Sequence, residues 1–291
     1  MEAPTGLEVV LAYGAEIAEG PVWDRRTNRL AWVDIPARRI YLTDVRTGVS
    51  EVIETPLHVG AVVPRAAGGF VAALQDGFWV VGDGPAHRIT AVAEARPGVR
   101  FNDGKCDPAG RFWAGTMAYD QSSGAGALYR LDSDGHATRV LDGVTVSNGL
   151  AWSLDERTMY YIDTPTQRID AFSFVPATGE ITDRRTEIQI PADVGAPDGM
   201  TIDAEGGLWV ALWGGAAVHR YLDGRLDRVI KLPVSHPTSC TFGGEDLDEL
   251  YVTSAWEGLS EEERTAQPLA GGLFRIRPGV RGVPAAVFVG V

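Results

Sequence analysis

The chain has 291 residues, of which 45% are hydrophobic, and it carries a net charge of -13. This composition is ordinary for a globular protein with a full core. The acidic balance argues against nucleic acid, whose phosphates reward clustered Lys and Arg, and against an anionic membrane surface. No apolar run approaches the ~20 residues of a membrane span, and the N-terminus lacks the pattern of a signal peptide. With only two cysteines, Cys106 and Cys240, the sequence favours a reducing, cytoplasmic location.

Six segments of the chain share one plan. A polar residue and a glycine lead an apolar strand, a short turn follows, and a second strand carries an aromatic residue. The segments begin about every 40–50 residues, which is the length that four strands and their turns need in one blade of a propeller. Their leading residues, in chain order, are Glu19, Gly60, Asn102, Asn148, Asp198 and Thr238.

Each of the six segments predicts a pair of strands joined by a turn. In chain order, the six pairs occupy residues 19–35, 60–74, 102–116, 148–164, 198–212 and 238–254. Third strands follow in most units, and their alternation of apolar and polar residues is the period of a half-buried strand. Helical periodicity is scarce, except that Ser260 and Glu263 form a plausible capping box before a short helix.

We predict one domain over residues 1–291, an all-β, six-bladed β-propeller with a central metal-binding channel. A sandwich or an open array of repeats is the alternative, but a closed ring leaves fewer exposed strand edges. Residues 7–14 and 285–291 are both strand-like. We expect these N- and C-terminal strands to pair in one blade and close the ring.

The leading positions predict a ring of side chains in the channel, because the first strand of each propeller blade lines it. Five of the six offer a side-chain oxygen, which suits a hard cation. Burying Glu19 beside Asp198 would be costly without such a cation. The alternative interpretation is that the Asn-Gly and Asp-Gly pairs are ordinary turns. Other chemistries have less support, since the sequence contains no GxSxG motif and no close pair of metal-ligating histidines.

The chain resembles the regucalcin (senescence marker protein), gluconolactonase and luciferin-regenerating enzyme family in stretches that span nearly its whole length. The matching stretches are AEGPVWD from Ala18, RFNDGKCDPAGRFWAGTM from Arg100, VSNGLAWSLDERTMYYIDT from Val146, PDGMTIDAEGGLWVA from Pro197, TSCTFGG from Thr238 and QPLAGGLF from Gln267.

The resemblance implies a six-bladed propeller with one divalent cation in the channel. The ligands that it implies for the cation are Glu19, Asn148 and Asp198. The residues that it implies for substrate contact are Arg100, Asn102 and Asp120, the last in a loop of variable type. Calcium is the favoured ion, and zinc, magnesium, manganese and iron are alternatives.

The sequence therefore predicts a metal-dependent hydrolase that converts a small sugar lactone to the aldonic acid. The cation would polarise the carbonyl, and either Asp198 as general base or a metal-bound hydroxide would provide the attack. Alternatives on the same fold are a phosphotriester or other ester hydrolase and a non-catalytic calcium-binding propeller. The protein is expected to be a monomer or a weak homo-oligomer.

Overall fold

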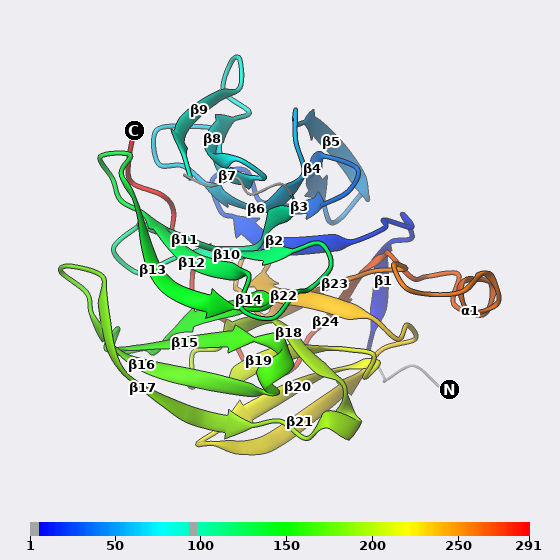
Figure 1. Ribbon diagram of the computed structural model, residues 1–291. Helices are drawn as coiled ribbons and strands as arrows, with labels where there is room; N and C mark the ends of the chain where they lie inside the picture. The colour runs from blue at the N-terminus through cyan, green and yellow to red at the C-terminus, as the bar shows by residue number, and fades with distance from the viewer. Residues whose placement is uncertain (1–5, 93–97) are drawn as a thin grey trace.

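The computed structural model describes residues 6–92 and 98–291, and its strands form six antiparallel sheets of four strands each (Figure 1). The sheets follow one another in chain order around a central axis, as the blades of a propeller do. This arrangement confirms the all-β, six-bladed β-propeller predicted from the repeats. No helix among the described residues is long and apolar enough to cross a membrane.

Each of the first three blades is a run of four consecutive strands. Blade 1 contains β2 (Ala18–Asp24), β3 (Arg29–Asp34), β4 (Arg39–Asp44) and β5 (Val49–Glu54). Blade 2 contains β6 (Val59–Pro64), β7 (Phe70–Leu74), β8 (Gly77–Val81) and β9 (His87–Ala91). Blade 3 contains β10 (Val99–Cys106), β11 (Phe112–Ala118), β12 (Gly126–Leu131) and β13 (Ala137–Val144).

The next two blades repeat this order, and the sixth differs in its outermost strand. Blade 4 contains β14 (Ser147–Trp152), β15 (Thr158–Asp163), β16 (Arg168–Val175) and β17 (Glu180–Gln189). Blade 5 contains β18 (Ala196–Ile202), β19 (Leu208–Trp213), β20 (Ala217–Leu222) and β21 (Arg225–Lys231). Blade 6 contains β22 (Pro237–Gly243), β23 (Glu249–Ser254), β24 (Leu273–Ile276) and β1 (Glu8–Leu11).

The ring is closed by β1, which pairs antiparallel with β24. Residues 285–291, which were predicted to pair with the N-terminal strand, do not join its blade. Phe288 forms an isolated parallel bridge with Arg65, in blade 2, and the Val289 amide donates to the Gly110 carbonyl in blade 3. The last residues therefore run across the second and third blades, and the N-terminal strand finds its partner about twelve residues before them.

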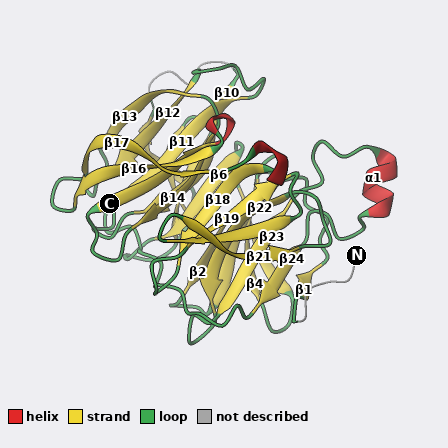
Figure 2. Ribbon diagram, turned by 90° about the horizontal axis from the view of Figure 1, so that it is seen from below, coloured by secondary structure: helices red, strands yellow, loops and turns green. Residues whose placement is uncertain are grey.

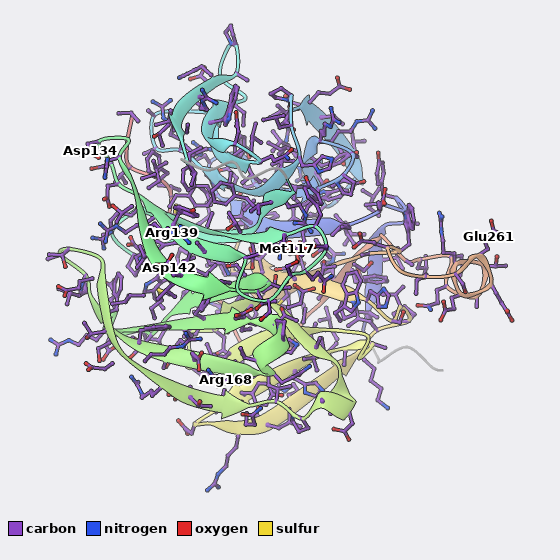
Figure 3. All side chains as sticks on the ribbon, viewed as in Figure 1. Met117, Asp134, Arg139, Asp142, Arg168 and Glu261 are labelled. Carbon is purple, nitrogen blue, oxygen red and sulfur yellow. The ribbon has the colours of Figure 1, made fainter. Side chains whose placement is uncertain are left out.

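Helical structure in the described chain is confined to short pieces, namely η1 (Thr164–Thr166), η2 (Ala192–Val194) and α1 (Glu261–Ala266). The predicted capping box is present at α1, where Ser260 and Glu263 bond reciprocally. The helix projects from the side of the sixth blade (Figure 2), and Glu261 lies at this outlying position (Figure 3).

Apolar side chains between adjacent blades form six separate clusters, one for each contact between neighbours. Between blades 3 and 4, for example, Trp113 packs edge-on against Trp152 and Phe174. Burial of this surface is the main force that holds one blade against the next. The core is thus distributed around the ring, which leaves the axis to the inner strands.

Buried carboxylates reinforce the turns that follow some inner strands. Asp203, which is 0% exposed, accepts hydrogen bonds from Nε1 of Trp209 and Nε of Arg220, both at 2.7 Å. Arg220 is itself only 2% exposed and also binds Glu205 and Asp227. In blade 3, Asp107 holds Trp113 and a nearby arginine in the same way.

This network predicts that Asp203→Ala lowers the free energy of unfolding by about 3–5 kcal/mol, because a buried guanidinium loses its buried partner. Asp227→Ala, which removes a partly exposed carboxylate from the same arginine, should cost about 1 kcal/mol or less. Urea denaturation followed by circular dichroism measures both. Equal losses in the two variants would contradict the role given to burial.

Candidate functional site

Every inner strand is irregular at its predicted ring position. The register with the second strand shifts between Glu19 and Val22, Val59 and Ala61, Phe101 and Gly104, Ser147 and Leu150, Pro197 and Met200, and Pro237 and Ser239. Bulges of this kind break the alternation of a strand and redirect a side chain. The Asn-Gly and Asp-Gly pairs are therefore not strand-ending turns, since they lie within inner strands.

The glycines of these pairs are required by the close approach of neighbouring inner strands. A Cβ on Gly149 would lie 2.5 Å from Cβ of Met200 in the next blade. A Cβ on Gly199 would lie 2.0 Å from Oγ of Ser239 in the blade after that. Real Cβ atoms do not approach so closely, so the sequence spacing of polar residue and glycine reflects packing around the axis.

Two carboxylates from separate blades meet in this ring. Glu19 on β2 is 2% exposed, Asp198 on β18 is 6% exposed, and the two side chains are close enough to influence each other's ionisation. Burial, followed by the negative charges of Asp198 and Asp103, raises the pKa of Glu19 well above its usual range. Burial and the charge of Asp103 likewise raise the pKa of Asp198. Both shifts arise first from burial and then from neighbouring negative charge, so added positive charge would reduce both.

The two predicted amides extend the cluster along the neighbouring inner strands. Nδ2 of Asn102 donates to Oδ1 of Asn148 at 3.0 Å and to the carbonyl of Ser147 at 2.8 Å. Nδ2 of Asn148 donates to Oγ1 of Thr164 at 2.7 Å, and Thr164 in turn donates to the Pro197 carbonyl. These bonds fix the Asn148 amide so that its oxygen, not its nitrogen, faces Asn102.

Arg100 joins the cluster through Asn102. Its Nη1 donates to Oδ1 of Asn102 at 2.6 Å and to the Phe101 carbonyl at 3.0 Å. The guanidinium is only 8% exposed. Burial lowers the pKa of Arg100, while the charge of Glu257 opposes that shift. Because both of these hydrogen bonds use one nitrogen, the other N–H groups of the fork remain for an oxygen-rich ligand.

Sequence reasoning missed an aromatic support beside Arg100. The guanidinium carbon lies 5.9 Å from the centre of the Tyr119 ring, and the Tyr119 hydroxyl is 2.7 Å from Nδ1 of His58. His58 directly precedes β6 of blade 2, and Tyr119 directly follows β11 of blade 3. No sequence signal pairs these residues, because they lie on different blades and meet only after the ring has formed.

Two other predicted positions do not reach the cluster in this structure. Asp120 is exposed, and its Oδ1 accepts the Ser122 amide at 3.0 Å within its own loop. Thr238 turns its hydroxyl to the Ala18 carbonyl and to Thr253. Thr238 therefore links blade 6 to blade 1, and the oxygens that do converge come from the other polar leading positions.

The structure adds Asp103 and Lys105, which neighbour Asn102 on β10. Asp103 is 4% exposed and accepts the Gly104 amide at 2.6 Å. Nζ of Lys105 donates to the Met200 carbonyl at 2.6 Å, so this side chain spans from blade 3 to blade 5. Burial lowers the pKa of Lys105, and the carboxylate of Asp103 opposes the shift. The acidic cluster thus has one ammonium and one guanidinium beside it.

The donor chemistry of the cluster fits a hard divalent cation. Glu19, Asp198 and the Asn148 amide provide oxygens alone, which is the ligand type that calcium and magnesium prefer. The raised pKa values of the two carboxylates mark a place where added positive charge would be stabilising. Among the described residues, no set of three or more His, Cys, Asp or Glu side chains forms a metal-holding group. The fit therefore depends on the amide oxygen together with the carboxylate pair.

Comparisons with known proteins show which proteins this chain resembles. A model of the SMP-30/gluconolactonase/LRE-like region matches residues 17–256. Regucalcin of Danio rerio is 43% identical over 291 residues and covers 98% of both chains. YvrE of Bacillus subtilis (strain 168), named provisionally as a sugar lactone lactonase, is 38% identical and covers 95% of this chain and 96% of its own. The calcium-binding protein regucalcin of Agrobacterium tumefaciens has a TM-score of 0.93 at 29% identity, covering 98% of this chain and 97% of its own.

The carboxylate pair predicts an unusual gain in stability on neutralisation. In chelator at pH 7, Glu19→Gln and Asp198→Asn should each raise Tm by about 3 °C or more, which corresponds to about 1 kcal/mol for a chain of this size. A carboxyl whose folded pKa is raised favours folding below its unfolded value of about 4 and loses that contribution as pH rises through the folded value. The gain over wild type should therefore widen between about pH 5 and pH 8.

Differential scanning fluorimetry measures these shifts, and Asp193→Asn, at an exposed aspartate five residues before Asp198, is the matched control. Its Tm should follow wild type at every pH. A lower Tm for both site variants in chelator would contradict the proposed shortage of positive charge.

Proposed function

The chain belongs to the SMP-30/gluconolactonase/LRE-like family, and we propose that it is a metal-dependent lactonase that hydrolyses a sugar lactone to the aldonic acid. The observation that carries this proposal is the convergence of two buried carboxylates, Glu19 and Asp198, with a guanidinium and two amides. Such a site combines a place for a cation with donors and acceptors for hydroxyl groups. The provisional lactonase name of the Bacillus relative supports the reaction class.

Glu19, Asn148 and Asp198 are the proposed ligands of one divalent cation. Calcium is the proposed ion, since the donors are oxygens and a relative of closely similar fold is a calcium-binding protein. When bound, the cation supplies polarisation of the lactone carbonyl and stabilises the charge that develops on its oxygen.

Arg100 and Asn102 are proposed to orient the substrate. The guanidinium is held by Asn102, by the Phe101 carbonyl and against the Tyr119 ring, so its free N–H groups are fixed in direction before a ligand arrives. A fixed planar fork suits the several oxygens of a sugar lactone and loses little entropy on binding. Asp120 follows Tyr119 directly, and we propose it as an acceptor for a sugar hydroxyl at the edge of the same site.

Asp198 is the proposed general base. Its carboxylate takes a proton from the water that attacks the carbonyl carbon of the lactone. The bond between that carbon and the ring oxygen then breaks, and the proton passes from Asp198 to the ring oxygen, which leaves a hydroxy acid. Burial and the charge of Asp103 make this carboxylate more basic than an exposed aspartate.

Asp198→Asn should lower kcat for glucono-1,5-lactone hydrolysis by about 10²–10⁴-fold, the range for loss of a general base. Asp193→Asn should keep wild-type kcat. Titration of the acid released measures both rates, and circular dichroism checks that each variant is folded. Turnover by folded Asp198→Asn within a few-fold of wild type would exclude this aspartate as the base.

Removal of bound metal with a chelator, followed by desalting, should abolish hydrolysis, and added CaCl₂ should restore it. Glu19→Gln removes one proposed ligand charge, so restoration should need about tenfold more calcium or greater. Parallel titrations with magnesium, manganese and zinc identify the ion that works best. Full activity in protein shown by elemental analysis to be metal-free would refute the metal requirement.

A further inference from the structure

A cavity of about 550 Å³ lies along the inner strands, next to the polar cluster. Each blade contributes residues that follow its ring position by one to eight places, in the inner strand and in the turn after it. Representative lining residues from the six blades in turn are Val22, Val63, Lys105, Ala151, Ile202 and Thr241. Because each inner strand leads from the ring into this space, the cavity occupies the far part of the channel. Cavities of about 300–1,000 Å³ are the usual size for small-molecule sites.

The C-terminal segment forms one wall of this cavity. Residues 283–287 line it, and they are tied to the body on both sides. Gly282 and Asp203 form an isolated bridge, and the Phe288 amide donates to the Pro64 carbonyl. The segment thus spans from the fifth blade to the second and gives the far part of the channel an apolar wall that the blades alone do not provide.

The lining is mostly apolar but includes one nitrogen donor with unused capacity. The Lys105 ammonium carries three protons, and the Met200 carbonyl, at 2.6 Å, accepts one of them. Trp152 also lines the cavity, but its indole nitrogen is buried inside the protein and does not face a ligand there. An acceptor oxygen in the cavity would therefore be stabilised by the ammonium of Lys105.

Charge selects among the ligands that could provide this oxygen. Asp103 and Glu156 line the same cavity and offset the single ammonium, and the chain as a whole carries a charge of -13. An anionic ligand would meet these carboxylates in an apolar space, where desolvation is expensive. A neutral molecule avoids this cost and still gains from burial along the valine and isoleucine walls.

We propose that the far part of the channel is a second small-molecule site, which binds a neutral, largely apolar compound through a carbonyl oxygen. Lys105 provides the donor, and the walls between Val22, Ile202, Trp152 and the C-terminal segment bury the apolar body. The site adjoins the polar cluster, with which it shares Asp103 and Lys105, and it does not depend on the proposed lactonase activity. It gives one channel two chemically different ends.

The neutral aryl ketone Prodan (6-propionyl-2-dimethylaminonaphthalene) is a direct probe, because its emission moves to shorter wavelength in an apolar site. Wild-type protein should bind it saturably with a blue shift, in chelator as well as with calcium and glucono-1,5-lactone present. The anionic naphthalene sulfonate ANS should bind at least about tenfold more weakly, given the carboxylates in the lining. Absence of saturable Prodan binding, or tighter binding of ANS, would overturn the proposal.

Two variants locate the probe. Ala286→Trp fills the cavity from the C-terminal wall, and Lys105→Met removes the ammonium while keeping the length of the side chain. Both should weaken Prodan binding about tenfold or more, the second because a hydrogen bond to a charged donor is lost. Val287→Trp serves as a second filled cavity if the first variant does not fold.

The chain offers a matched control for each variant. Ala177→Trp places the same ring on an exposed turn, and Lys231→Met removes the other of the two lysines, which is exposed. Both should bind Prodan as wild type does. Unchanged affinity in the folded cavity variants, or equal losses in the controls, would show that Prodan binds elsewhere and would refute the site.

Discussion

The close contact between two buried carboxylates, Glu19 and Asp198, is the constraint around which the rest of the channel is arranged. They come from blades 1 and 5. Burial raises the cost of ionising both, the charge of Asp198 adds to the cost for Glu19, and the charge of Asp103 adds to the cost for Asp198. An isolated pair of this kind opposes folding at neutral pH, so it persists only where neighbours or a ligand offset it. Arg100 and Lys105 do so in part, but each is also engaged with uncharged oxygens. The remaining deficit of positive charge is the physical basis for the proposed cation binding.

The bulges of the six inner strands make this contact possible. A regular strand would turn successive side chains to opposite faces, into the clusters between blades. At each ring position the register shift interrupts that pattern, and in three of the blades a glycine lets the next inner strand pass within a distance that no side chain would tolerate. The register shift recurs in all six blades, although only four of the six leading residues carry polar groups of the cluster. The bulge therefore does not depend on a polar leading residue in the site, since it is present at Gly60 and Thr238, which do not join the site.

The blades and the core of the site could be read from the sequence because both follow the repeat. Equivalent positions of a repeat must lie at one depth in a closed ring, so Glu19, Asn102, Asn148 and Asp198 could be grouped before any coordinates. Contacts outside the repeat could not be grouped in this way. Tyr119 and His58 come from separate loops, and Lys105 of blade 3 reaches blade 5, which is not its neighbour. The C-terminal segment contacts blades 2 and 5, and no local sequence pattern relates it to them. Ring closure was anticipated, but the partner of β1 was not, because strand-like composition does not specify which edge a strand will join.

The pairing of β1 with β24 also has a kinetic consequence. During synthesis β1 leaves the ribosome well before its partner, which is made more than 260 residues later. At a rate of about 5–20 residues per second, β1 must wait for many seconds as an unpaired edge while the intervening blades assemble. Because β1 has only four residues, it exposes few unpaired backbone groups to which a wrong strand could pair during that time. The last step of folding is then a long-range closure, which sets the order in which the channel, and any ligand within it, can become enclosed.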